Sequence, residues 1–161
     1  MKPLICLLTV FLILFLAKKV GHFPRLTLSL SGRIAMACML LMTGISHFPM
    51  AEGMALMLPE WLPFKIEVVY TTGILEILSA IGLLMPSTQR LTGWMLIIFF
   101  FLIFPANILA ALNHVNIQEA NLNGPGSAYL WFRVPLQVFF IGWVWYFTIK
   151  NPSGEVKLTE G

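Results

Sequence analysis

Long apolar runs separated by short polar connectors dominate the sequence. Four of the runs have 20 to 22 residues each, and they cover 28–48, 66–85, 91–112 and 129–149. At about 1.5 Å of rise per residue, each run makes a helix that crosses a hydrocarbon core of about 30 Å. The pattern therefore predicts an all-α integral membrane protein, folded as an antiparallel four-helix bundle.

A fifth, shorter run precedes these four. It covers residues 4–17, and Lys18 and Lys19 follow it at once. Its length of 14 residues also fits a signal-peptide core or an interfacial segment. The residues after it, Ala-Lys-Lys-Val-Gly-His, do not form a small-residue cleavage site. We therefore expect an additional, uncleaved N-terminal hydrophobic helix, while the sequence leaves open whether it spans. The predicted parts are the anchor and basic linker at 1–27, the membrane domain at 28–149 and a polar tail at 150–161.

Basic residues gather in alternate connectors. Seven of them lie in the linker before the second run, in the first turns of the second run, at Arg90 and in the tail. The two other connectors, 49–65 and 113–128, hold only Lys65. By the positive-inside rule, the two long connectors face outside and the C-terminal tail is cytoplasmic. If the first run spans, the N-terminus lies outside.

The composition agrees with a lipid environment and excludes several functions. Hydrophobic residues make up 58% and charged residues 11%, whereas soluble domains carry about 25% charged residues. Cys6 and Cys38 lie in apolar runs, 32 residues apart and without metal-ligand spacing. We therefore expect no metal site and no dithiol centre of the chain's own. The net charge of +3, with dispersed basic residues, argues against nucleic-acid binding.

Five polar side chains lie inside the predicted helices or at their ends. Glu76 is ten residues beyond the start of its run, near the midplane, where a carboxylate costs about 2.5–3.5 kcal/mol unless it has a partner or is protonated. Arg133 and Gln137 share a helix face because they are four residues apart. Since all five approach from the outer side, the sequence predicts a polar pocket in the outer half of the bundle. Its residues are His47, Glu76, Asn107, Arg133 and Gln137, flanked by Trp61, Gly73, Pro105 and Pro135.

Each pocket residue also has a structural explanation, which the sequence leaves open. Glu76 paired with Arg133 or Gln137 would join helices, and Asn107 would do the same. Arg133 and His47 would also fit the membrane interface near helix ends. Of the flanking residues, Gly73 allows close approach of another helix, and the two prolines free backbone carbonyls for polar side chains or water.

Short motifs containing these residues follow one another along the chain. They include Thr43-Gly44-Ile45-Ser46-His47-Phe48, Pro59-Glu60-Trp61-Leu62-Pro63, Thr72-Gly73-Ile74-Leu75-Glu76, Phe104-Pro105-Ala106-Asn107 and Arg133-Val134-Pro135-Leu136-Gln137. From about Arg33 to Trp145, their order resembles the DoxX-like family of small bacterial membrane proteins. The chain departs from that family at Val134, where a leucine is usual. The resemblance implies a four-helix bundle of the bacterial inner (cytoplasmic) membrane, to which residues 4–17 are an N-terminal addition.

Relatives in that family include a subunit of thiosulfate:quinone oxidoreductase. The resemblance therefore favours an inner-membrane accessory protein whose pocket binds a small amphipathic molecule, such as a quinone, in a redox or stress pathway. Arg133, Gln137 or Asn107 would donate hydrogen bonds to it, and Glu76 or His47 would move protons.

Enzymatic activity stays open, because the chain has no complete catalytic motif, flavin motif or dithiol. A quinone-linked oxidoreductase subunit would need a membrane or periplasmic redox partner to supply electrons. The alternatives are an assembly factor or structural subunit for other membrane proteins and, ranked lower, a small-solute transporter. A homo-oligomer is compatible with each of these functions.

Overall fold

The computed structural model describes residues 2–21 and 26–152, and within these ranges every regular element is helical. Residues 153–161 of the predicted tail and Arg25 of the linker lie outside the described residues. The elements are α1 (Lys2–Lys19), α2 (Leu28–Ser46), α3 (Ala51–Ala55), α4 (Lys65–Leu84), α5 (Gln89–Leu112), the 3-10 turn η1 (Gly126–Tyr129), α6 (Leu130–Val144) and the π-helical segment η2 (Trp145–Lys150).

Within the described part of the chain, four helical segments are long and apolar enough to cross a membrane. They are Leu28–Ser46, Lys65–Leu84, Gln89–Leu112 and Gly126–Lys150. If η1 is set aside and α6 is taken together with η2, the five apolar runs of the sequence agree with the observed helical segments to within two residues at every end. The chain therefore fits a multi-pass membrane protein.

The link between α4 and α5 is as tight as its proline and polar residues predict. Met85 has extended backbone angles, φ −84° and ψ 122°, because a residue before proline avoids the helical region. The Thr88 hydroxyl then donates to the carbonyl of Gly82 over 3.0 Å. Since this carbonyl lies in the last turn of α4, the bond satisfies an acceptor that the end of the helix would leave free.

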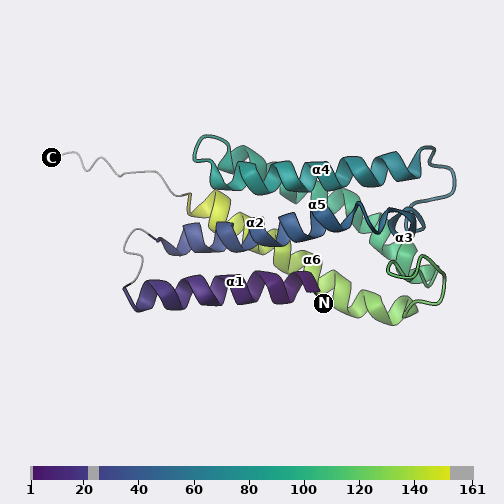
Figure 1. Cartoon of the computed structure of the whole chain (residues 1–161), viewed down its shortest axis with the longest axis horizontal. Coiled ribbons are helices and arrows are strands. Elements are labelled where there is room, and N and C mark those ends of the chain that lie inside the picture. The colour runs from purple at the N-terminus through teal and green to yellow at the C-terminus, as the bar shows by residue number, and fades with distance from the viewer. Residues whose placement is uncertain (1, 22–25, 153–161) are drawn as a thin grey trace.

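The connectors separate into two ends of the molecule (Figure 1). Residues 47–64, which include α3, and residues 113–125 gather at one end, which we term the loop end. The link at 85–88 and the end of η2 lie at the other, the turn end. At the loop end the two connectors pack tightly, because a Cβ added to Gly53 would lie 2.0 Å from the carbonyl oxygen of Ile117.

The hydrophobic core lies between α1, α2, α4, α5 and α6. It contains Leu7 from α1, Met36 and Leu40 from α2, Leu83 from α4 and Leu96 from α5, all almost fully buried. Helix α1 lies beside α2 (Figure 1) and is part of this core. Many large apolar side chains on α4, α5 and α6 are exposed, as a surface in contact with lipid requires.

Candidate functional site

Two glycines bring α2 and α4 into close contact. A Cβ added to Gly44 would lie 2.8 Å from the Gly73 carbonyl oxygen, and one added to Gly73 would lie 2.7 Å from the Cβ of His47. Small residues at a contact between membrane helices let the two backbones approach in this way. The sequence prediction that Gly73 admits a close neighbour is confirmed, and the neighbour is α2. We term the contact along Gly44 and Gly73 the α2–α4 seam.

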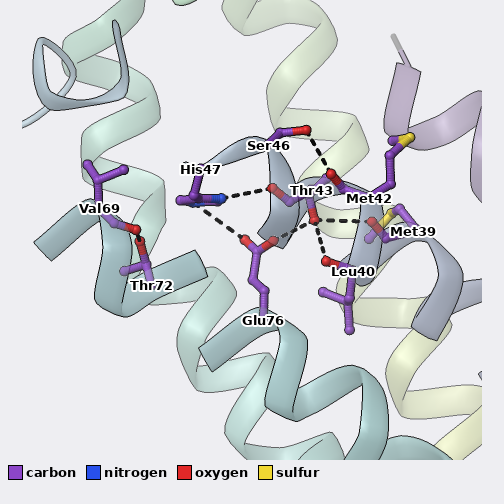
Figure 2. Close-up of polar contacts among 9 residues, drawn as sticks. All are labelled: Met39, Leu40, Met42, Thr43, Ser46, His47, Val69, Thr72 and Glu76. Carbon is purple, nitrogen blue, oxygen red and sulfur yellow. Dashed lines mark hydrogen bonds and ion pairs between the residues drawn. The ribbon is translucent and has the colours of Figure 1, made fainter. Parts of the chain in front are cut away.

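Three polar side chains meet beside this seam (Figure 2). The Thr43 hydroxyl lies 2.5 Å from Oε2 of Glu76. His47 points toward the same carboxyl group, with its Nε2 4.0 Å from Oε1 of Glu76. Glu76 is only 7% exposed, as the cost of a carboxyl group in the membrane leads one to expect. We call Thr43, His47 and Glu76 the seam cluster.

The main chain of Thr43 fixes the orientation of the imidazole ring. Nδ1 of His47 lies 2.9 Å from the Thr43 carbonyl oxygen. Because a carbonyl oxygen only accepts hydrogen bonds, Nδ1 carries a proton and donates it to this bond. Nε2 is the nitrogen that faces Glu76.

The hydroxyl of Thr43 has three acceptors within hydrogen-bond distance but only one hydrogen to donate. Besides Oε2 of Glu76, it lies 3.1 Å from the Met39 carbonyl oxygen and 3.2 Å from that of Leu40. When Thr43 donates to the carboxylate, Glu76 is satisfied as an anion. When Thr43 donates to its own helix, a protonated Glu76 donates to the hydroxyl oxygen instead. The cluster thus accommodates either protonation state of the acid.

Aromatic side chains flank the cluster on the surface of the molecule. Phe48 follows His47, and Tyr70 lies one helical turn before Gly73 on α4. The two rings stack with centroids 5.6 Å apart and an interplanar angle of 16°, and both are exposed. The His47 side chain is itself 14% exposed.

Gln137 lies elsewhere, between α6 and α5. Its Nε2 donates to the Phe100 carbonyl oxygen over 2.6 Å, and the side chain is buried. Pro105 follows Phe100 by five residues and lies inside α5, where it removes one N–H donor from the helix. The carbonyl that Pro105 leaves without its helical donor is that of Phe101, four residues earlier. Gln137 bonds to the neighbouring carbonyl of Phe100 instead, so the expected role of the prolines stays a prediction.

Asn107 and Arg133 line a small cavity at the loop end. The cavity measures about 10 Å³, which is about the space that one water molecule requires. Asn107 belongs to α5, and Arg133 lies in the first turn of α6. The remaining lining residues are Met57, Ala110, Ala111, Val115, Ile117, Pro125 and Gly126.

The five predicted pocket residues thus occupy three places. His47 and Glu76 form the seam cluster with Thr43, Asn107 and Arg133 share the loop-end cavity, and Gln137 bonds to α5. Of the flanking residues, Gly73 lies at the seam. Pro105 and Pro135 are inside α5 and α6, and Trp61 is 80% exposed on the connector 47–64.

Two further residues matter here. Thr43 lies four residues before His47, and the spacing of a shared helix face is the sequence signal that points to it. Arg33 contributes to the charge bias of the sequence, yet its side chain is 2% exposed and its Nη1 lies 3.5 Å from the Leu83 carbonyl oxygen. Its location at the end of α4 depends on tertiary packing.

The two cysteines lie on neighbouring helices despite their separation in sequence. Cys6 belongs to α1 and Cys38 to α2, which pack against each other, and both thiols are free and partly exposed. Their sequence spacing held no sign of this, because it follows from the packing of α1 against α2.

Comparison with known proteins gives one family. A family model with the description Domain of unknown function (DUF8561) matches residues 36–148, from the middle of α2 to η2. Searches among curated proteins and among solved structures give no match. Since the match includes the seam cluster, the cavity and most of the sequence, the chain belongs to this family, described as Domain of unknown function (DUF8561).

Proposed function

We propose that this protein is an accessory membrane protein that binds a small amphipathic molecule of the quinone type at the seam cluster and exchanges protons with it. The observation that carries the proposal is the facing pair of Nε2 of His47 and Oε1 of Glu76, 4.0 Å apart. That distance exceeds a direct hydrogen bond. A third polar atom can therefore lie within hydrogen-bond distance of both.

A quinone has the groups that such a pair recognises. Its carbonyl oxygen accepts a hydrogen bond from Nε2 of a protonated His47 or from a protonated Glu76, and its ring is apolar and flat. Reduction to a quinol consumes two electrons and two protons. The seam cluster would relay the protons, while a membrane or periplasmic redox partner would supply the electrons.

The proposed setting is the bacterial inner membrane. The four long helices would form an antiparallel bundle with α1 as an additional helix, the loop end outside and the C-terminus cytoplasmic. Two observations support this setting. Both long connectors gather at the loop end (Figure 1), and neither contains a lysine or arginine, since Lys65 begins α4. The resemblance of the motifs to the DoxX-like family favours the same membrane and a redox or stress pathway.

Binding of a short-chain benzoquinone analogue to the detergent-purified protein tests the proposal. Quenching of intrinsic tryptophan fluorescence gives the affinity. We expect Glu76→Leu and His47→Leu each to weaken binding about two- to tenfold, since each substitution removes a hydrogen-bond donor and the loss of one hydrogen bond costs about 0.5–1.5 kcal/mol. Ser46→Ala is the matched control, because Ser46 adjoins the cluster but its hydroxyl donates only to the Met42 carbonyl oxygen of its own helix. Equal affinity in all four proteins would refute a quinone site here.

A second candidate function is that of an assembly factor or structural subunit for other membrane proteins. The observation that favours it is the internal bonding of the buried polar groups, with Thr43 on Glu76 and Gln137 on the α5 backbone. On this hypothesis Glu76→Gln leaves partner capture unchanged, because the substituted amide still bonds to Thr43. Co-purification after mild detergent extraction separates the two functions when the wild type and Glu76→Gln are compared. If Glu76→Gln retains its partners and its quinone affinity is unchanged, the structural role is favoured.

A further inference from the structure

The loop-end cavity is a second polar location, remote from the seam cluster in its residues and its helices. It lies where α5, η1 and the start of α6 meet the connectors, and its polar side chains are Asn107 and Arg133. Asn107 is 6% exposed. An amide buried to this extent is an expensive group to desolvate unless a partner satisfies it.

The charged side chain that lines this cavity is a cation, Arg133. Arg133 provides a permanent charge with five N–H donors, so it can bind an occupant in addition to its other contacts. Gly126, which also lines the cavity, begins η1 and thus the helical segment that continues into α6. The N-terminal end of a helix adds a partial positive charge at the same place. None of the cavity's lining residues is acidic.

The walls determine which anion fits. Met57, Ala110, Ala111, Val115, Ile117 and Pro125 are apolar. The space corresponds to about one water molecule, which excludes phosphate, sulfate and amphipathic carboxylates. A monatomic ion with a single charge tolerates an apolar wall better than a multiply charged sulfate or phosphate does, because it loses less hydration energy on entry.

We propose that the loop-end cavity binds a single halide ion, chloride under natural conditions, between the guanidinium group of Arg133 and the side-chain amide of Asn107. The ion would tie the first turn of α6 to α5 and to the connector that carries Met57. This site is independent of the quinone proposal, since it shares no residue with the seam cluster.

The test is an exchange of anions at constant ionic strength. The detergent-purified full chain is titrated with sodium chloride or sodium bromide in place of sodium gluconate, whose anion is too large for the cavity, and Tm is followed by tryptophan fluorescence. We expect a saturable rise in Tm with both halides, because an ion that binds only the folded state stabilises it. Arg133→Gln and Asn107→Leu should abolish the rise, whereas Arg90→Gln, which removes an exposed cation at the turn end, should keep it.

Line broadening of the chloride-35 resonance provides a second measurement that does not depend on the stability of the variants. The wild type should broaden the resonance, and bromide should reverse the effect by competition. If the wild type has the same Tm in chloride and in gluconate and does not broaden the chloride-35 resonance, the proposal is overturned and the cavity holds a water molecule. A halide response that persists in folded Arg133→Gln and Asn107→Leu would overturn it by placing the ion elsewhere.

Discussion

Thr43 positions both titratable side chains of the seam cluster. Its hydroxyl contacts the carboxyl group of Glu76, and its main-chain carbonyl accepts the hydrogen bond from Nδ1 of His47. One residue thereby fixes the distance between an acid and a base and selects the imidazole nitrogen that faces the acid. The arrangement requires a side chain with a hydroxyl group at this position, four residues before the histidine.

Thr43→Val tests this role at the scale of the residue. Valine keeps the shape of threonine but leaves Oε2 of the buried Glu76 without the hydroxyl, so we expect the free energy of unfolding to fall by about 1–3 kcal/mol. Reversible unfolding in mixed micelles, followed by circular dichroism, measures the change. Thr71→Val is the matched control on exposed α4 surface, where the hydroxyl bonds only to Glu67 of its own helix, and it should change stability by less than about 0.5 kcal/mol. Equal effects of the two substitutions would contradict the assigned contact.

The burial of Glu76 was predictable, but its partner was not. The cost of a carboxyl group at membrane depth indicates a buried, paired side chain whatever the fold. Which helix supplies the partner depends on helix order and rotation, and these are set by the glycine contacts between α2 and α4. Arg133, which the sequence offered as a partner, lies instead at the loop-end cavity.

At the scale of the helix, the α2–α4 seam depends on the absence of side chains at two positions. Gly73→Ala would place a Cβ 2.7 Å from that of His47 and 2.9 Å from the Gly44 carbonyl oxygen. We expect a loss of about 1–3 kcal/mol of stability, because a backbone carbonyl cannot move aside without separating the helices. Gly142→Ala is the control, since a Cβ there meets nothing within 4 Å, and it should be neutral or stabilising by up to about 1 kcal/mol. Equal stability of the Gly73→Ala and Gly142→Ala variants would contradict the close packing of α2 against α4.

The packing of α1 against α2 gives a prediction for the cysteines. Because Cys6 and Cys38 lie on two helices that pack against each other and both thiols are free and partly exposed, we expect a bifunctional thiol reagent to bridge them within one chain. Intact-mass spectrometry would show one reagent per chain with no free thiol remaining, and Cys6→Ser would instead leave the reagent attached at one end. Two reagents on the wild-type chain, one at each cysteine, would indicate that α1 does not pack as described.

The ends of the long helices could be read from the sequence because apolar runs end where polar residues begin, and the observed ends differ by at most two residues. Other elements carried no such signal. Helix α3 has five residues, too few for a hydrophobic period, and it is positioned by Gly53 against Ile117. The π-helical segment η2 continues the apolar run of α6 without a change in composition.

At the scale of the whole molecule, the proposed orientation rests on the two ends. Single cysteines placed at Asn123 of the loop end and at Ser87 of the turn end, in a chain with Cys6 and Cys38 replaced by serine, report on it directly. A membrane-impermeant thiol reagent should label position 123 from outside an intact inner membrane and position 87 only after the membrane is opened. Labelling in the reverse order would invert the topology and place the seam cluster toward the cytoplasm.

The central claim is that a quinone-type molecule forms hydrogen bonds with the carboxyl group of Glu76. Infrared difference spectroscopy of the protein with and without the quinone analogue tests it most directly, because the carboxyl stretching bands respond to protonation and hydrogen bonding at that group. We predict a difference band in the carboxyl region for the wild type that is retained in Ser46→Ala and absent from Glu76→Gln. A carboxyl region that is identical in the wild type and Glu76→Gln would contradict the account.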